Sequence, residues 1–264
     1  MNLLKPVLSK DFTQLSYSRF FFTLAVQMQA VVMGWRMYDL THDPLALGFI
    51  GLAEAIPALG LAMYAGFIVD HSSPTKVFRG VLAGSLFSAL ILFASAVWSG
   101  HLSVQAQVVL LYVSSVCTGA SRAFSQPSVF AIVPKIVARE QWSKATAWMT
   151  SFSQIARISG PALGGILFGF FGMRFTFALI CVLLVVSAAF ASQLRAQIAP
   201  ARKMSESDAL WRELLAGLKF VVQHKILFPA MALDMVSVLF GGVTALLPIY
   251  ASEILLTGPK GLGI

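Results

Sequence analysis

Long apolar stretches alternate with short polar or turn-forming breaks along most of the chain. A membrane-spanning α-helix needs roughly 20 mostly apolar residues, because each residue advances the helix by about 1.5 Å. Backbone polar groups in hydrocarbon must be satisfied within their own segment, so stretches of this length are expected to be helical. The pattern predicts spans at residues 17–39, 45–69, 77–98, 104–125, 143–168, 173–194 and 226–252.

The composition of the chain supports this interpretation. Hydrophobic residues make up 58% of the sequence, charged residues 11%, and the mean hydropathy is +0.80. A water-soluble fold of this composition would have too little polar surface to cover its core. We therefore expect an all-α membrane protein embedded in the lipid bilayer, with seven transmembrane helices.

Positive charge is distributed unevenly across the predicted spans. The net charge is +8, and most Lys and Arg residues fall in breaks on the side that carries the N-terminus. The opposite side keeps only Arg174 and Lys260, while Arg36 and Arg157 lie within spans. An excess of Lys and Arg in cytoplasmic loops is the positive-inside signature, so we expect a cytoplasmic N-terminus and no nucleic-acid partner. The expected location is the plasma membrane, which in a bacterium is the inner membrane.

The breaks are short except for the one after the sixth span. Short breaks make consecutive helices antiparallel neighbours, so residues 1–194 are expected to form an N-terminal six-helix bundle. Residues 195–225 predict a cytoplasmic linker whose apolar residues recur at helical spacing, as an amphipathic interfacial helix or an extension of the next span. Residues 226–264 would hold the first helix of an incomplete C-terminal bundle. We expect a fragment that lacks the C-terminal half needed for transport.

The break between the second and third spans reads GFIVDHSSPTKVFR, from Gly66 to Arg79. Gly66 would let helices approach closely, and Asp70 can accept charge-assisted hydrogen bonds from a basic side chain or a helix N-terminus. The segment resembles the signature of the major facilitator superfamily, with His and Ser in place of the usual Arg and Gly. The resemblance implies a conformational gate formed by Gly66, Asp70, Lys76 and Arg79. The alternative is that Asp70 is an ordinary solvated loop charge.

The fifth predicted span contains SGPALGG, with glycines at 160, 164 and 165. Small residues at this spacing give a flat helix face for close packing, and Pro161 bends the helix. The run resembles the antiporter motif of the same superfamily, which is associated with exporters. The matching residues are Gly160, Pro161, Gly164 and Gly165. Generic packing of membrane helices is the alternative explanation.

A broader resemblance covers nearly the whole chain. The runs WRMYDLTHDPLALGFIGLAEAIP, SRAFSQPSVFAIVP and GGVTALLPIYASEIL are similar, in this order, to the drug and siderophore exporter branch that includes the enterobactin exporter. The resemblance implies a secondary active exporter, truncated after its seventh helix, in which two six-helix bundles rock about a midplane site. The implied cargo is a small amphiphilic molecule, and the implied coupling ion is H⁺.

Ionisable and strongly polar residues within spans mark candidate functional positions, because a charge in a span costs about 2.5–3.5 kcal/mol on insertion scales. Glu54 is a candidate proton carrier, since removal from water favours the protonated form of a carboxylic acid. The alternative is a Glu54 that bonds to neighbouring helices or faces an outward-facing cavity. Arg157 must face a cavity or a carboxylate, and Glu54 is the deep carboxylate available in the first six spans. Gln27 and Gln154 are expected to contact substrate or a neighbouring helix.

Other charged residues have simpler expected roles. Arg36 and Asp39 stand three apart on one helix face and predict a structural ion pair. Arg122, at the inner end of the fourth span, is expected to extend to the membrane interface. Asp234, near the cytoplasmic end of the seventh span, is expected to pair or to contribute to the gate.

The sequence contains no HExxH, no GxxxxGK[ST] loop and no CxxC. We therefore expect no enzyme activity, no cofactor and no metal. Two alternatives to an exporter remain open: an importer of a metabolite from the same superfamily, and a non-transporting membrane sensor or scaffold that acts through its basic linker.

Overall fold

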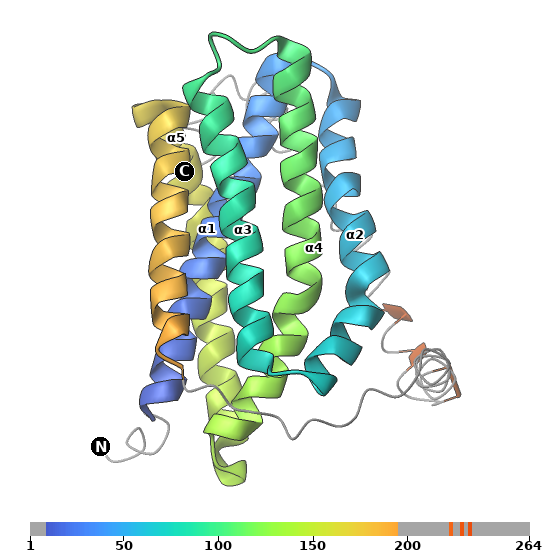
Figure 1. Cartoon of the computed structure of the whole chain (residues 1–264), viewed down its shortest axis with the longest axis vertical. Helices are drawn as coiled ribbons and strands as arrows, with labels where there is room; N and C mark the ends of the chain where they lie inside the picture. The colour runs from blue at the N-terminus through green and yellow to red at the C-terminus, as the bar shows by residue number, and fades with distance from the viewer. Residues whose placement is uncertain (1–8, 195–221, 224–227, 230–231, 234–264) are drawn as a thin grey trace.

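The computed structural model describes residues 9–194, 222–223, 228–229 and 232–233 (Figure 1). The all-α prediction is confirmed for this part of the chain, which contains helices and no strands. The elements between residues 9 and 194 are α1 (Lys10–Thr41), α2 (Pro44–His71), α3 (Pro74–Val97), α4 (Val104–Ile136), the 3₁₀ helix η1 (Arg139–Gln141) and α5 (Trp142–Ser192). The backbone of α5 leaves the helical region at Gly172, with φ 78° and ψ 178°. α5 therefore has two arms, which correspond to the predicted fifth and sixth spans.

Capping residues set where the helices begin. The Ser9 hydroxyl accepts a hydrogen bond from the Phe12 N–H at 3.2 Å, which starts α1 seven residues before the predicted span. Asp43 caps α2 and Ser103 caps α4 in the same way. Side-chain oxygens at these positions satisfy N–H groups that have no partner within the helix. Hydropathy alone does not detect these polar first turns.

The helices form a bundle in which neighbours in space are not always neighbours in sequence (Figure 1). α1 packs mainly against α5, α2 against α4, and α3 against both α4 and α5. The fully buried core includes Leu15 and Met28 of α1, Phe78 of α3, and Phe177 and Ile180 of α5. α2 is the least buried helix, with a row of exposed apolar residues.

Within the described residues, four helical stretches are long and apolar enough to cross a membrane: Pro44–His71, Pro74–Val97, Val104–Ile136 and Arg139–Ser192. The last stretch contains both arms of α5. The first predicted span is helical, but it carries Gln27, Gln29 and Arg36, which make it less apolar. Gln29 is buried and donates to Ser88 at 3.2 Å and Thr118 at 3.1 Å, so its polarity is satisfied inside the bundle.

α4 continues beyond the predicted end of the fourth span, from residue 125 through Pro127 and Pro134 to Ile136. The run SRAFSQP resembles a polar break in the sequence, but its polar side chains face other helices and a cavity, so the helix does not need to end there. Three further predictions lie outside the described residues: the helix in the 195–225 linker, most of the 226–252 span, and Asp234.

Candidate functional site

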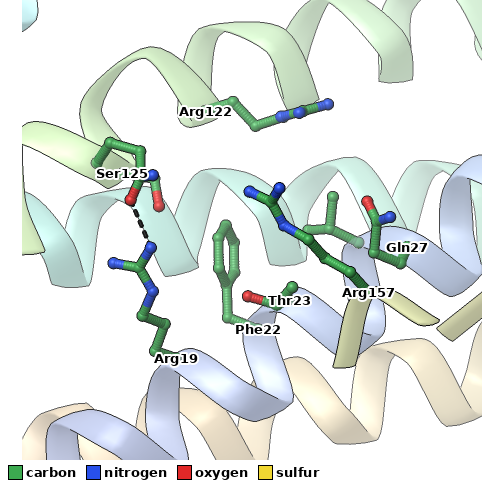
Figure 2. Close-up of a pocket in the computed structure, with 9 residues that line it drawn as sticks. Arg19, Phe22, Thr23, Gln27, Arg122, Ser125 and Arg157 are labelled. Carbon is green, nitrogen blue, oxygen red and sulfur yellow. Dashed lines mark hydrogen bonds between the residues drawn. The ribbon is translucent and has the colours of Figure 1, made fainter. Parts of the chain in front are cut away.

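An open cavity of about 230 Å³ lies among α1, α4 and α5, and three of its lining residues, Arg122, Gln126 and Arg157, are exposed (Figure 2). Its lining is polar apart from two apolar side chains, and consists of Arg19, Phe22, Thr23, Val26, Gln27, Arg122, Ser125, Gln126 and Arg157. A second cavity of about 400 Å³ shares Arg19, Gln126 and Arg157 with the first and adds Gln154. The structure therefore places Gln27, Gln154 and Arg157 at one connected site, as a group of cavity residues. Glu54 does not line either cavity.

Helical spacing explains how the polar residues gather. Arg19, Thr23 and Gln27 lie four residues apart, so they project from one face of α1. Arg122 and Gln126 share a face of α4 for the same reason. Because α1 and α4 both border the cavity, these two polar faces are opposed across it (Figure 2). The regular spacing from Arg19 to Gln27 was a sequence feature that could have identified Arg19 and Thr23 as site residues.

Arg19 connects three helices. Its Nε donates to the Ser153 hydroxyl of α5 at 3.2 Å, and its Nη2 donates to the Gln126 side-chain oxygen of α4 at 2.5 Å. Both acceptors are neutral, so Arg19 is held in place without being neutralised. The guanidinium charge therefore remains available to the cavity.

Glu54 of α2 forms an ion pair with Arg122 of α4. The helices cross closely here, because a Cβ at Gly119 would collide with the Glu54 backbone carbonyl. Gly119 lies one helical turn before Arg122, so the same crossing brings the guanidinium to the carboxylate. The predicted pairing of Glu54 with Arg157 is wrong, because Glu54 contacts Arg122 instead.

Arg157 lies in the first arm of α5 and points into the cavity beside Gln27 (Figure 2). Among the described residues it has no hydrogen-bond or ion-pair partner. Arg19 lines the same cavity, and the two like charges repel each other. Arg157 was predicted to face a cavity or a carboxylate, and it faces a cavity.

The glycines of the SGPALGG run face α1. A Cβ at Gly160 would lie 2.6 Å from the Gln27 Cβ, and a Cβ at Gly164 would lie 3.1 Å from the Met28 Cα. Gly165 is also buried, whereas Pro161 is half-buried within the helix. The close contact at Gly160 fixes the α1 turn from which Gln27 reaches the cavity.

The turn between α2 and α3 holds the predicted gate residues. Asp70 and Lys76 are exposed, and neither has an ion-pair partner among the described residues. A Cβ at Gly66 would meet nothing within 4 Å in that part of the chain, so the predicted close approach of another helix is not made by these elements.

Arg79 has a different role from the other residues of this turn. Its guanidinium donates to three carbonyls at the end of α5, those of Ala191, Ser192 and Leu194, at 3.1, 3.0 and 2.9 Å. A cation at a helix C-terminus satisfies carbonyls that lack intrahelical partners and complements the helix dipole. Arg79 therefore connects the first turns of α3 to the C-terminal end of α5.

At the opposite end of the bundle, the predicted pair of Arg36 and Asp39 is confirmed, with an N–O distance of 2.7 Å. Arg36 also donates to the Gln107 side-chain oxygen of α4 at 2.7 Å. Arg174 donates to the Ala96 carbonyl at the end of α3 at 3.1 Å.

In the described part of the chain, no three His, Cys, Asp or Glu side chains gather, so no metal centre is assigned.

Comparison with known proteins decides the family. The sequence profile of the family described as transmembrane secretion effector, within the major facilitator superfamily (MFS), matches residues 2–264. The chain belongs to this MFS family. It is therefore a multi-pass membrane protein of a transporter family, and the arginine-lined cavity is a cavity within an MFS helix bundle.

Curated MFS relatives support the same assignment at low identity. An uncharacterized MFS-type transporter of Bacillus subtilis is 26% identical over 78% of this chain and 51% of its own length. Macrolide efflux protein A of Streptococcus pyogenes is 23% identical over 78% and 49%. The staphyloferrin A transporter of Staphylococcus aureus is 22% identical over 61% and 39%. The chain spans about half the length of the curated relatives it matches.

Proposed function

We propose that this MFS chain is part of a secondary active exporter of small amphiphilic molecules that works by alternating access and is coupled to H⁺. The observation that carries the proposal is the Glu54–Arg122 ion pair beside the polar cavity, in the middle of an MFS bundle. Relatives described as a macrolide efflux protein and a putative multidrug resistance protein support the export direction.

The cavity would provide the substrate contacts. Gln27 and Gln154 present amide groups to it, and Arg157 presents a charge. A second bundle would complete the cavity wall, and rocking of the two bundles would expose the site to each side of the membrane in turn. The exposed Asp70 and Lys76 of the α2–α3 turn are available for contacts that form in only one of the two states, as a gate requires.

Glu54 is the proposed proton carrier. When its carboxylate is protonated, the attraction to Arg122 is lost, and the positive charge of Arg122 becomes available to the cavity. Proton binding on α2 is thereby converted into a change of charge at the substrate site on α4. The pair joins two helices, so its breakage also loosens the α2–α4 crossing.

We further propose that the N-terminus is cytoplasmic and that the membrane is a bacterial inner membrane. Lys76, Lys135, Arg139 and Lys144 lie at the end of the bundle where α1 begins, near the α2–α3 turn and η1 (Figure 1). This clustering agrees with the positive-inside rule.

The test is efflux of a fluorescent drug panel driven by a pH gradient, measured in everted membrane vesicles. The chain is compared with a version extended by a second six-helix half. Proton-linked transport by the extended form supports the exporter, and its loss in the Glu54→Gln variant supports the proton carrier. Efflux that keeps its pH dependence in Glu54→Gln rules out Glu54. If a well-folded extended form transports no drug of the panel, the result contradicts the exporter and supports a membrane sensor or scaffold.

The Glu54–Arg122 ion pair also fits an importer, which is the second candidate. Because protonation of Glu54 releases Arg122, a proton and an anionic cargo would bind together, as a symporter requires. Entry of cargo into intact cells with alkalinisation of the medium would support this alternative over export.

A further inference from the structure

We propose that the cavity between α1, α4 and α5 selects anionic cargo, specifically amphiphiles that carry a carboxylate or a similar oxyanion. The proposal rests on the proposed transport function and names the substrate class of the same site. It is based on three arginines that surround one cavity: Arg19, Arg122 and Arg157.

The charges at this site do not cancel. Among the described residues, Glu54 is the one carboxylate that contacts any of the three arginines, and it contacts Arg122. Arg19 is bonded only to neutral oxygens, and Arg157 has no described partner. Two positive charges are therefore left facing the cavity, where an oxyanion would supply the missing counter-charge.

Arg157 differs from the other arginines of the helices. Arg36, Arg79 and Arg174 all donate hydrogen bonds to acceptors near a helix end. An arginine in mid-span without such partners is expensive in a membrane, and such residues mark ligand pathways. A guanidinium that is aimed into a cavity and has its donors free is preorganised to bind an oxyanion with two parallel hydrogen bonds.

The remaining lining suits the rest of an amphiphilic anion. Thr23 and Gln27 offer neutral hydrogen-bonding groups, and Phe22 lies beside Arg19 with its ring facing the same space (Figure 2). The adjoining cavity of about 400 Å³ brings in Phe130, Trp142 and Met149, which give it apolar walls. Space of this size holds a small organic molecule, with its charged end at the arginines and its apolar part beyond them.

Equilibrium binding to the whole chain, in nanodiscs of zwitterionic lipid, tests the proposal. The probes are a dansyl-labelled fatty acid and its uncharged amide, which differ only in charge, and the fluorescence of chain-free discs is subtracted. We expect the acid to bind roughly tenfold more tightly than the amide, and Arg157→Gln to remove roughly this tenfold advantage while leaving amide binding unchanged. Arg157→Lys should retain part of it, because the charge remains but the bidentate geometry is lost.

Arg139→Gln is the matched control, because it removes the same charge from η1 outside both cavities. Equal binding of acid and amide, or an equal loss in Arg139→Gln, would overturn the proposal. An anionic lipid headgroup could offer the same chemistry. If phosphatidylglycerol in the discs abolishes acid binding to the native chain, the site belongs to lipid and the cargo proposal fails.

The outcome is separable from that of the proposed function. Vesicle transport of neutral or cationic drugs, with no preference for the acid in nanodiscs, would overturn the anion selectivity and leave transport standing. Preferential acid binding that depends on Arg157, with no transport of any panel member, would remove the transport function and leave an anion site.

Discussion

At the end of the bundle opposite the α2–α3 turn, Arg36 binds Asp39 and Gln107, and Arg174 binds a backbone carbonyl of α3. In the interior cavity, Arg157 has no described partner, and Arg122 shares a single carboxylate with a neighbouring helix. Arginine has a different role in each of the two regions. At the helix ends arginines connect elements of the fold, whereas in the interior their charge is left facing a space that a ligand can enter.

The difference has an energetic basis. The Arg36–Asp39 pair lies within one helix, so its loss costs little. The Glu54–Arg122 pair is about as exposed, but it joins two helices, and removal of one partner leaves a charge at the helix crossing without its counter-charge. Substitutions that remove one charge should therefore change stability and probe binding differently in the two regions.

Arg122→Gln should have the largest effect, because it leaves the Glu54 carboxylate without its counter-charge. We expect the free energy of unfolding to fall by about 2 kcal/mol, which is below the cost of breaking a fully buried pair because water screens the half-exposed Arg122 side chain. Thermal unfolding in detergent measures this. The double variant Glu54→Gln/Arg122→Gln should recover most of the loss, and a double variant no more stable than the single one would contradict the pair.

Arg174→Gln removes a charge-assisted hydrogen bond to the Ala96 carbonyl. The free energy of unfolding should therefore fall by about 1.5 kcal/mol, the lower end of the range for hydrogen bonds to charged groups. Binding of the anionic probe should not change. Arg157→Gln is the informative counterpart, because it removes an unpaired interior charge and should leave stability unchanged or raised while weakening probe binding. Equal stability losses in the two variants would contradict the distinction between the regions.

Glu54→Gln should tighten binding of the anionic probe about fivefold, or about 1 kcal/mol, because Arg122 is no longer neutralised. The charged groups around Glu54 are Arg122, which contacts it, and Arg19 and Arg157, which face the same cavity. Probe titrations of the two proteins at one neutral pH measure the difference. Equal affinities would count against Glu54 as the group that neutralises Arg122.

Asp39→Asn should have the smallest effect, a loss of about 0.5 kcal/mol in the free energy of unfolding, as is typical of exposed ion pairs within one helix. The Asp39 side chain is 54% exposed, and its partner Arg36 belongs to the same helix. High salt should reduce even this difference. A loss comparable to that of Arg122→Gln would show that the outer pair is as important as the interior one.

Sequence reasoning succeeded where a feature depends on local spacing. The helices follow from apolar length, the Arg36–Asp39 pair follows from its separation of three, and the close packing of Gly160 follows from small residues on one face. The family assignment followed from motifs that the profile match bears out.

The interior pair could not be obtained in this way. Glu54 and Arg122 are separated by 68 positions, and they meet because α2 and α4 cross at Gly119. Arg157 was paired with Glu54 on sequence grounds because both lie deep in their spans, but depth does not tell which helices adjoin. The continuation of α4 was missed because polar residues that face a cavity look, in a hydropathy pattern, like residues that face water.

The surplus positive charge of the cavity also gives the bundle an electrical property. If the bundle reorients with Arg19 and Arg157 uncompensated, positive charge moves through part of the membrane field, where a full crossing changes the energy by about 2.3 kcal/mol per charge for each ~100 mV. An anion held at the arginines cancels that charge, so the loaded bundle would respond less to voltage than the empty one. With the cell interior negative, the empty cavity would be drawn toward the cytoplasm, the side on which an exporter collects its cargo.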